Sequence, residues 1–283
     1  MTDRYAVFGN PIGHSKSPRI HALFAAQTGQ AISYEAILAA KDGFAAAVNA
    51  FIAAGEGSAR GANVTVPFKE EAFRLATRRT TRADAAGAVN TLSFDAGAII
   101  GDNTDGAGLV RDLKNNLGCD PAGRRILLLG AGGAARGVIL PLLLENPAEL
   151  LIANRTEETA ARLALEFANP FARLPGCAVG VKPDGTGFPG LGGRTFDLVI
   201  NATSAGLSNA VLPLPTSVFA RHCVAYEMFY GRETPFMAQA GAAGARIADG
   251  LGMLVEQAAE AFFIWRGVRP HTAPVLAALK SAS

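Results

Sequence analysis

A strand-length apolar run that ends in a cluster of glycines constrains this chain more than any other feature. Residues 125–129 read RILLL, residues 130–135 read GAGGAA, and apolar side chains at helical spacing follow. A strand, a glycine turn and a helix in this order form the G-x-G-x-x-A fingerprint of dinucleotide-binding proteins. We expect Gly130 to make the tight turn, Gly132 to admit a pyrophosphate near the backbone, and Ala135 to let the helix pack closely on the strand.

The surroundings of this segment distinguish a nucleotide site from an ordinary α/β turn that binds no ligand. A second apolar run, LLIA at residues 150–153, follows about 20 residues later, as a strand–helix–strand unit requires. In such a unit the pyrophosphate binds the free N–H groups at the helix N-terminus. The spacing therefore favours a dinucleotide site over the ordinary turn.

The residues after the second strand indicate which dinucleotide binds. NAD sites usually have Asp or Glu at this place, whereas this chain has Asn154, Arg155 and Thr156. A carboxylate repels a 2′-phosphate, and a guanidinium pairs with it through charge-assisted hydrogen bonds. The segment therefore favours NADP over NAD, and the alternative is that Arg155 is a solvated loop arginine.

Composition excludes several other classes of protein. The 283 residues are 49% hydrophobic and 18% charged, which indicates a globular chain with room for two domains. The net charge is +2, and no basic cluster suggests nucleic acid as a partner. We expect no membrane span, because no apolar run approaches about 18 residues, and no signal peptide at the N-terminus. Cys119, Cys177 and Cys223 lie too far apart to indicate disulfides or a metal site, which favours a cytoplasmic protein.

The N-terminal half alternates between strand and helix patterns and predicts an α/β domain of its own. Strands are expected at 5–9, at 32–38 and from residue 61, with a helix at 44–52 and a hairpin formed by 88–94 and 98–101. The first helix should have Ser17 as its N-cap and Pro18 as its first helical residue. Lys69 falls in the first turn of a later helix, where a cation opposes the helix dipole, so we interpret it as a functional residue.

The second half continues the nucleotide-binding pattern. A long helix is expected from Asp105 through Leu117, further strands at 196–200 and 222–226, and C-terminal helices from about residue 250 and over 273–279. Residues 174–194 are rich in Gly and Pro and are expected to form a long loop around a short strand. The predicted fold class is therefore α/β, with a Rossmann-like region after the first domain.

Eight motifs that occur in this order resemble the shikimate dehydrogenase family, which also includes quinate dehydrogenases. They are GHSKSP at 13–18, NVTVPFK at 63–69, AVNT at 88–91, GDNTDG at 101–106, GAGGA at 130–134, NRT at 154–156, NATS at 201–204 and GLGMLVEQ at 250–257. The resemblance implies an α/β substrate-binding domain at 1–105 and 252–283, to which the C-terminal helices return. It also implies a Rossmann-like NADP-binding domain at 106–251 and the NADP-dependent, reversible reduction of 3-dehydroshikimate to shikimate in aromatic amino-acid biosynthesis.

The resemblance further implies the residues of the site. Lys69 and Asp105 are the implied catalytic pair, with Lys69 as the group that transfers the proton. Ser15 and Ser17 would bind the substrate carboxylate. The other implied substrate-binding residues are Asn63, Thr65, Asn90, Tyr230 and Gln257. NADP would contact Gly130, Ala131, Gly132, Gly133, Ala134, Asn154, Arg155, Thr156, Thr203, Ala205, Met228 and Gly250. No metal is implied.

Five of these residues also have purely structural interpretations. Ser15 and Ser17 would then be turn and cap residues. Asn90 would serve only its own hairpin, Asp105 would only cap a helix, and Gln257 would be an exposed helix residue.

The chain also departs from the family pattern at two places. Similar NADP-using enzymes commonly carry a second arginine shortly after the NRT motif, but Glu157, Glu158 and Thr159 stand here and Arg162 is the next base. Two carboxylates near a 2′-phosphate are unfavourable, so selectivity for NADP is weakened unless Arg162 substitutes. Glu227 stands where the family more often has Asp.

Two other functions remain as alternatives at this point. One is a quinate or dual quinate/shikimate dehydrogenase that uses NAD, against which the retained Ser17 argues, because quinate-preferring relatives often have Thr there. The other is a non-catalytic dinucleotide-binding regulator, which would need neither Lys69 nor Asp105. In each case the protein is expected to be a monomer or a homodimer.

Overall fold

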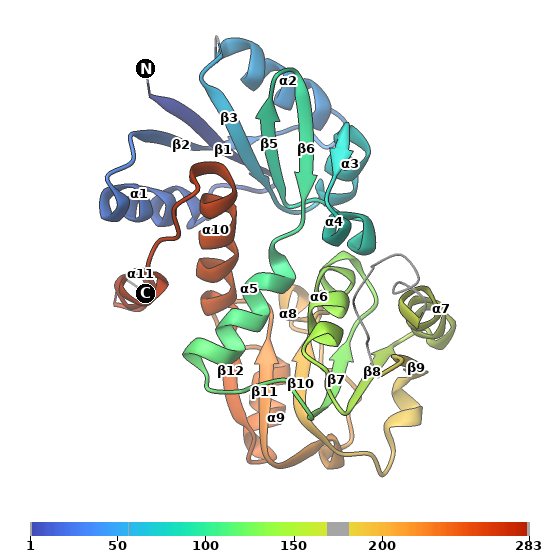
Figure 1. The fold of residues 1–283 in the computed structure, drawn as a ribbon. Helices are drawn as coiled ribbons and strands as arrows, with labels where there is room; N and C mark the ends of the chain where they lie inside the picture. Colours follow the sequence, from blue (N-terminus) through green and yellow to red (C-terminus); the bar gives the residue numbers. More distant parts are fainter. Residues whose placement is uncertain (1, 56, 169–180, 282–283) are drawn as a thin grey trace. The chain divides into compact units, whose positions relative to one another are not determined.

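The computed structural model describes residues 2–55, 57–168 and 181–281, and the chain divides into two compact units (Figure 1). Unit 1 consists of Met1–Gly108 and Leu254–Ser283, and unit 2 consists of Leu109–Met253. Each unit contains one six-stranded sheet. The predicted α/β fold class is confirmed, because strands and helices alternate in both units.

The sheet of unit 1 is mixed and has the strand order β2-β1-β3-β5-β6-β4. Its strands are β1 (Asp3–Gly9), β2 (Ile32–Leu38), β3 (Ala59–Val64), β4 (Arg78–Arg79), β5 (Thr91–Asp95) and β6 (Ala98–Asp102). Strand β1 pairs in parallel with β2 and β3, whereas β5 is antiparallel to both β3 and β6. The antiparallel β5–β6 pair confirms the predicted hairpin, and it carries the chain directly to Asp105.

Helices cover both faces of this sheet. The helices of unit 1 are α1 (Ser17–Thr28), α2 (Phe44–Ala54), α3 (Lys69–Leu75), α4 (Thr81–Ala86), α5 (Asp105–Arg111), α10 (Leu251–Arg266) and α11 (Thr272–Lys280), of which α5 and α10 extend into unit 2. On one face, Phe8 packs edge-on against Phe44 and Phe51 of α2, with ring centroids 5.9 Å apart in each pair. On the other face, Tyr5 packs on Trp265 of α10 at 4.7 Å. Side chains that alternate along β1 thus pack into two apolar cores, one on each face of the sheet.

The start of α1 differs from the prediction. Its N-cap is Lys16, which makes no side-chain capping bond, and Ser17 is already helical. The backbone N–H of Ser17 donates to the Ser15 hydroxyl at 3.3 Å. The prediction of Ser17 as N-cap was therefore wrong by one residue. The loop hydroxyl of Ser15 satisfies a donor of the first turn, as a capping side chain would do.

The sheet of unit 2 has the order β12-β11-β10-β7-β8-β9, and all its strand pairs are parallel. The strands are β7 (Arg125–Leu129), β8 (Glu149–Asn154), β9 (Asp184–Gly187), β10 (Phe196–Asn201), β11 (Phe219–Glu227) and β12 (Arg246–Asp249). The chain proceeds from β7 to one edge of the sheet and then returns to β10 on the other side of β7. This reversal of strand order is where doubly wound sheets bind ligands.

The remaining helical segments of unit 2 are η1 (Asp112–Asn116), α6 (Gly133–Leu144), α7 (Glu157–Ala168), η3 (Phe188–Leu191), α8 (Ala205–Ser208), η4 (Thr216–Val218) and α9 (Pro235–Ala242). Phe236 and Ala240 of α9 join Leu127 and Leu129 of β7 in one apolar core. The short strand β9 confirms part of the predicted 174–194 loop, whose residues up to 180, with Cys177, lie outside the described residues.

The helix predicted from Asp105 to Leu117 changes form midway. After α5 the chain continues as the π-helical segment η1, in which the N–H of Leu117 donates to the Asp112 carbonyl. The Asp112 carboxylate is buried and accepts from the Tyr226 hydroxyl at 2.6 Å and from the Asn116 amide at 2.9 Å. Within the described ranges, none of the helices has both the length and the hydropathy needed to cross a membrane.

Candidate functional site

Lys69 and Asp105 form an ion pair at the helix starts that the sequence predicts. Each is the first residue of its helix, α3 and α5 respectively. The Lys69 Nζ atom lies 2.6 Å from Asp105 Oδ2. The aspartate side chain is 8% exposed and the lysine side chain 27% exposed, so the carboxylate is nearly buried and the lysine side chain is partly exposed. A lysine in this situation has both a fixed position and a route for proton exchange.

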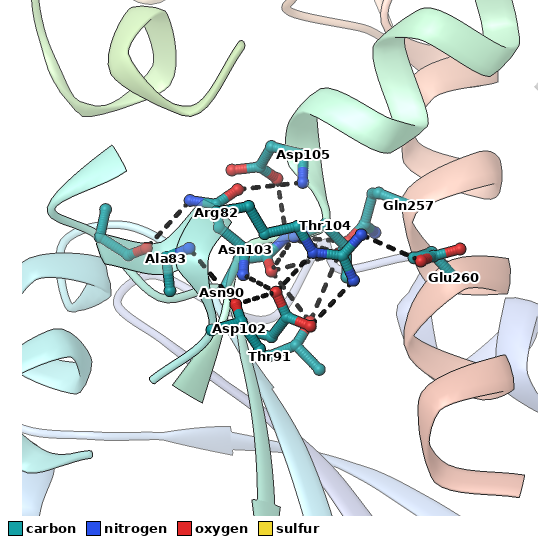
Figure 2. Close-up of polar contacts among 12 residues, drawn as sticks. Arg82, Ala83, Asn90, Thr91, Asp102, Asn103, Thr104, Asp105, Gln257 and Glu260 are labelled. Carbon is teal, nitrogen blue, oxygen red and sulfur yellow. Dashed lines mark hydrogen bonds and ion pairs between the residues drawn. The ribbon is translucent and has the colours of Figure 1, made fainter. Parts of the chain in front are cut away.

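Asn90 lies at the centre of a polar network that includes Asp105 (Figure 2). Its Nδ2 atom lies 2.8 Å from Asp105 Oδ1, 2.9 Å from Thr104 Oγ1 and 3.2 Å from Gln257 Oε1. Its Oδ1 atom accepts from the Thr104 N–H at 2.8 Å and from the Thr91 hydroxyl at 2.9 Å. Asn90 thus connects the hairpin, the start of α5 and helix α10, which is more than the interpretation as a hairpin residue requires.

Gln257 is the contribution of the C-terminal helix α10 to this network. It is only 9% exposed, so its interpretation as an exposed helix residue is wrong. Its Oε1 atom accepts from the Thr104 hydroxyl at 3.2 Å, and its Nε2 atom donates to the Leu254 carbonyl within the same helix. The residue therefore faces Asn90 and Thr104 with its amide orientation fixed.

Asn63, at the end of β3, is held by a residue that the sequence analysis missed. Its Nδ2 atom donates to the Asn90 carbonyl at 3.3 Å and to Thr91 Oγ1 at 3.2 Å, and its Oδ1 atom accepts from the Tyr34 hydroxyl at 2.7 Å. Burial raises the pKa of Tyr34 well above its ordinary value, so the hydroxyl remains a donor. The ring of His21 stacks on Tyr34 with centroids 4.2 Å apart.

Of the three hydroxyl residues predicted for the substrate, Ser15 lies in the loop after β1, Ser17 begins α1 at the end of that loop, and Thr65 lies in the loop after β3. These two strands are parallel neighbours, so the loops leave the same edge of the sheet. Ser17 is buried beside the Tyr34 hydroxyl, and Ser15 is half-buried. The methyl group of Thr65 would lie 2.5 Å from a Cβ atom at position 9, so Gly9 is required for this close approach.

The glycine turn of unit 2 has the geometry that its fingerprint predicts. Gly130 has φ +102°, a value that favours glycine, and a Cβ atom there would lie 3.1–3.2 Å from Ala202 and Thr203. Gly132 is the N-cap of α6. A Cβ atom at Gly132 or Gly133 would meet nothing within 4 Å, so the N-terminus of α6 is open. Ala131 and Ala134 are likewise not buried, and this open helix start suits a pyrophosphate.

The loops after β10, β11 and β12 bring the remaining candidates of unit 2 together. The Thr203 hydroxyl donates to Asn201 Oδ1 at 2.7 Å, and the Ala205 N–H donates to Thr203 Oγ1 at 3.2 Å. A Cβ atom at position 250 would lie 2.2 Å from the Met228 carbonyl oxygen, so only glycine allows these two backbones to meet. The predicted nicotinamide-facing residues therefore lie at one edge of the sheet.

Glu227, the departure from the family pattern, has a clear structural role. It is buried and accepts from Asn201 Nδ2 at 2.8 Å, from the Thr234 hydroxyl at 2.8 Å and from the Phe229 N–H at 3.1 Å. Burial raises the pKa of this carboxyl group. Its side chain joins the end of β10 to the N-cap of α9, Thr234.

Arg155 lies in the loop after β8, and its role toward a 2′-phosphate stays a prediction. It is exposed after β8 and makes no hydrogen bond or ion pair with the described residues, while Asn154 Nδ2 donates to the Thr156 carbonyl at 3.1 Å. Glu157 and Glu158 lie in the first turn of α7, where carboxylates complement the helix dipole. Arg162 is 73% exposed and lies 4.0 Å from Glu166 on the same helix.

Tyr230 is the one substrate-binding candidate that lies in unit 2. Its ring stacks on Phe229 with centroids 6.2 Å apart, and burial raises the pKa of its hydroxyl. Its role toward substrate stays a prediction. Among the described residues, no group of three or more His, Cys, Asp or Glu side chains is arranged to hold a metal ion.

Comparison with known proteins places the chain in a family. Three family models match it: the shikimate dehydrogenase substrate-binding domain over residues 7–92, shikimate/quinate 5-dehydrogenase over 112–176, and the shikimate 5′-dehydrogenase C-terminal domain over 250–280. A shikimate dehydrogenase (NADP(+)) of Dechloromonas aromatica is 61% identical, with 99% of this chain and 98% of that protein covered.

Solved structures agree with these matches. An Ael1 enzyme from Pseudomonas putida has 47% identity and a TM-score of 0.89, with 98% of both chains covered. Shikimate 5-dehydrogenase of Thermus thermophilus, solved in complex with NADP(H) and shikimate, has 32% identity and a TM-score of 0.83, with both chains fully covered. The chain belongs to the shikimate dehydrogenase family.

Proposed function

We propose that this protein is an NADP-dependent shikimate dehydrogenase, which interconverts 3-dehydroshikimate and shikimate. The observation that carries the proposal is the Lys69–Asp105 ion pair within the Asn90 network, because a protein that only binds dinucleotides needs no such pair. Relatives more than half identical over nearly the whole chain bear the name of this activity. We also propose that unit 1 is the substrate-binding domain and unit 2 the NADP-binding domain.

In this reaction a proton leaves or joins the substrate oxygen at the carbon that changes oxidation state. Lys69 is the proposed acid/base, since its ammonium group is fixed by Asp105 and its side chain is partly exposed. Asp105 orients the ammonium group with one carboxylate oxygen and is in turn held by Asn90 at the other. Both carboxylate oxygens are therefore fixed before substrate binds, which avoids reorganisation during the reaction.

The ring of the substrate carries a carboxylate and several hydroxyl groups, and unit 1 offers matching groups. We assign Ser15 and Ser17 to the carboxylate. Asn63, Thr65, Asn90, Asp105 and Gln257 supply donors and acceptors for the ring hydroxyls, and Tyr230 is the proposed contribution of unit 2. A site of this kind discriminates by leaving its own buried polar groups unpaired when a hydroxyl is missing.

Unit 2 fits NADP by its own geometry. The open start of α6 would hold the pyrophosphate, and exposed Arg155 would pair with the 2′-phosphate together with Asn154 and Thr156. Thr203, Ala205, Met228 and Gly250 would border the nicotinamide. When bound, NADP supplies the hydride acceptor or donor, and the protein supplies position and the proton route.

We further propose a cytoplasmic enzyme that acts as a monomer or a homodimer. Cys119 and Cys223 are both free and buried, in keeping with a reducing compartment.

Steady-state rates with shikimate and quinate, each with NADP and NAD, test the proposed function. We expect the highest kcat/KM with shikimate and NADP. Equal or better turnover of quinate with NAD would favour the quinate alternative, and the absence of turnover with all four combinations would favour a regulator.

A further inference from the structure

We propose that Arg82 is a positioning residue that aligns both Asp105 and Gln257, an inference that rests on the proposed function of these two residues. Arg82 lies in α4, outside every motif of the family resemblance. Its guanidinium group binds two buried carboxylates at once: Asp102, at the end of β6, and Glu260, on α10 (Figure 2). Asp102 lies three residues before Asp105 in the chain, and Glu260 lies three residues after Gln257 on α10.

The first connection fixes the end of β6. Arg82 Nε lies 2.5 Å from Asp102 Oδ1, and Arg82 Nη2 lies 2.8 Å from Asp102 Oδ2. The same carboxylate accepts from the Thr80 hydroxyl and from the Asn103 N–H, both at 2.7 Å. Four donors therefore hold the Asp102 side chain, and two of them form the planar, bidentate pair that arginine makes with carboxylates.

The turn between Asp102 and Asp105 transmits this position to the catalytic carboxylate. Asn103 Nδ2 donates to the Ala88 carbonyl at 3.0 Å, and its Oδ1 atom accepts from the Asp105 N–H at 3.1 Å. The Asn90 N–H donates to the Asp102 carbonyl at 3.0 Å. Every residue from Asp102 to Asp105 thus makes hydrogen bonds that fix the turn. A shift of Asp102 would therefore move Asp105 relative to Lys69.

The second connection fixes α10. Arg82 Nη1 donates to Glu260 Oε1 at 3.0 Å, and Arg269 Nη2 donates to Glu260 Oε2 at 2.7 Å. Glu260 is three residues after Gln257, so the two side chains lie on the same face of the helix. The contacts with Glu260 therefore fix the turn of α10 from which Gln257 reaches Asn90 and Thr104.

Arginine is the side chain that this place requires. Its guanidinium group has five N–H donors in one plane, so it can bind one carboxylate with two donors and a second with another. A lysine ammonium group is a compact point charge and cannot reproduce this arrangement. Because the Asp102 and Glu260 side chains are only 10% and 9% exposed, the donors cannot readily be replaced by water.

Separate variants of the two connections test the proposal by their kinetic signatures. Asp102→Asn should lower kcat for shikimate oxidation about 10- to 100-fold, with the shikimate KM near the wild-type value. Glu260→Gln should raise the shikimate KM about 2- to 10-fold, with kcat largely retained. Arg82→Leu should both lower kcat and raise the shikimate KM. Arg82→Lys should restore the wild-type value of at most one of these two parameters.

Arg79→Leu is the matched control. Arg79 pairs with Asp84 of the neighbouring helix α4 at 2.7 Å, but this pair faces solvent. The control should leave kcat and KM unchanged. If Asp102→Asn and Glu260→Gln instead lower only the melting temperature, or lower kcat equally with KM unchanged, Arg82 has a merely structural role and the proposal is wrong.

A crystal structure of Arg82→Leu separates this proposal from the proposed function. If the wild-type protein fails to oxidise shikimate, the proposed function is contradicted, yet the geometric claim still stands to be tested. We expect Lys69 Nζ and Asp105 Oδ2 beyond hydrogen-bond distance in the variant. An unchanged separation of 2.6 Å would overturn the role of Arg82.

Discussion

The Tyr34 hydroxyl donates to the side-chain oxygen of Asn63 at 2.7 Å, and this bond fixes which end of the Asn63 amide faces which neighbour. With Oδ1 occupied by Tyr34, Nδ2 is directed to the Asn90 carbonyl and to Thr91. Because β1 lies between β2 and β3 in the sheet, Tyr34 reaches across one strand to make this contact. A residue remote from Asn63 in the sequence therefore fixes the orientation of the Asn63 amide in the proposed substrate site.

Removing the Tyr34 hydroxyl should weaken substrate binding more than it affects turnover. A hydrogen bond between neutral groups contributes about 0.5–1.5 kcal/mol, so Tyr34→Phe should raise the shikimate KM about 2- to 10-fold with kcat little changed. Tyr5→Phe is the control, since Tyr5 contacts Arg266 and lies apart from the Asn90 network. Steady-state kinetics of both variants give the comparison, and equal KM values would show that Asn63 keeps its orientation without Tyr34.

Lys69→Ala should lower kcat by about 10²–10⁴-fold, the usual contribution of a positioned acid/base. Its shikimate KM should change far less, because the other substrate contacts remain. Asp105→Asn should lower kcat and also raise KM, since Asp105 is assigned a substrate hydroxyl. The double variant should be little worse than the worse single variant if the pair acts together. A Lys69→Ala variant with near-normal kcat and a raised KM would make the lysine a binding residue only.

Arg155→Ala should raise the KM for NADP about ten- to a hundredfold and leave the KM for NAD nearly unchanged. The reason is the loss of a charge-assisted bond to the 2′-phosphate, worth about 1.5–3 kcal/mol. Arg162→Ala tests whether Arg162 substitutes for the second arginine of the family, and it should leave the KM for NADP unchanged, because Arg162 is directed along α7 toward Glu166. If the wild-type enzyme uses NAD as well as NADP, the carboxylates of Glu157 and Glu158 outweigh Arg155 and the predicted preference is wrong.

His21 should make the protein less stable as the pH falls. Burial lowers the pKa of His21 from 6.5 to about 3, so below pH 6.5 the unfolded chain takes up a proton that the folded protein does not. The contribution of His21 to the free energy of unfolding is fully present above pH 6.5 and is lost as the pH falls toward 3. At pH 5 the loss in the free energy of unfolding should be about 2 kcal/mol.

Urea unfolding at pH 7.5 and pH 5 measures this effect. His21→Phe should show a smaller difference between the two pH values than the wild type, whatever its stability at pH 7.5. His14→Gln, which changes an exposed loop histidine, should behave as the wild type does. An equal pH dependence in His21→Phe would mean that other groups cause it.

Features that depend on neighbouring residues could be predicted from the sequence. The apolar run and glycines at 125–135 became β7, its turn and α6, and Lys69 and Asp105 begin helices as expected. The family assignment from short motifs is confirmed by the matched models and relatives. Local patterns suffice here because strand length, glycine turns and helix starts are decided within a few residues.

Features that depend on distant residues could not be predicted. Arg82 lies 20 residues from Asp102 and 178 from Glu260, and no pattern in the sequence relates an arginine to carboxylates at such separations. Tyr34 stands in a strand between Ile32 and Ala36, which lie on the same face of the strand and are apolar, so its hydroxyl gave no signal. The start of α1 also depends on the path of the preceding loop, which makes Lys16 the N-cap and brings the Ser15 hydroxyl to the N–H of Ser17.

The linked charges of Arg82, Asp102, Glu260 and Arg269 have a consequence for how this sequence can change over generations. Two cations and two anions balance one another, and both acids are nearly buried. Replacing one member leaves an uncompensated charge, which is far more costly than replacing an oppositely charged pair by apolar side chains of similar volume. Drift at these positions therefore proceeds in paired steps, and lineages that differ at one of them should differ at a second.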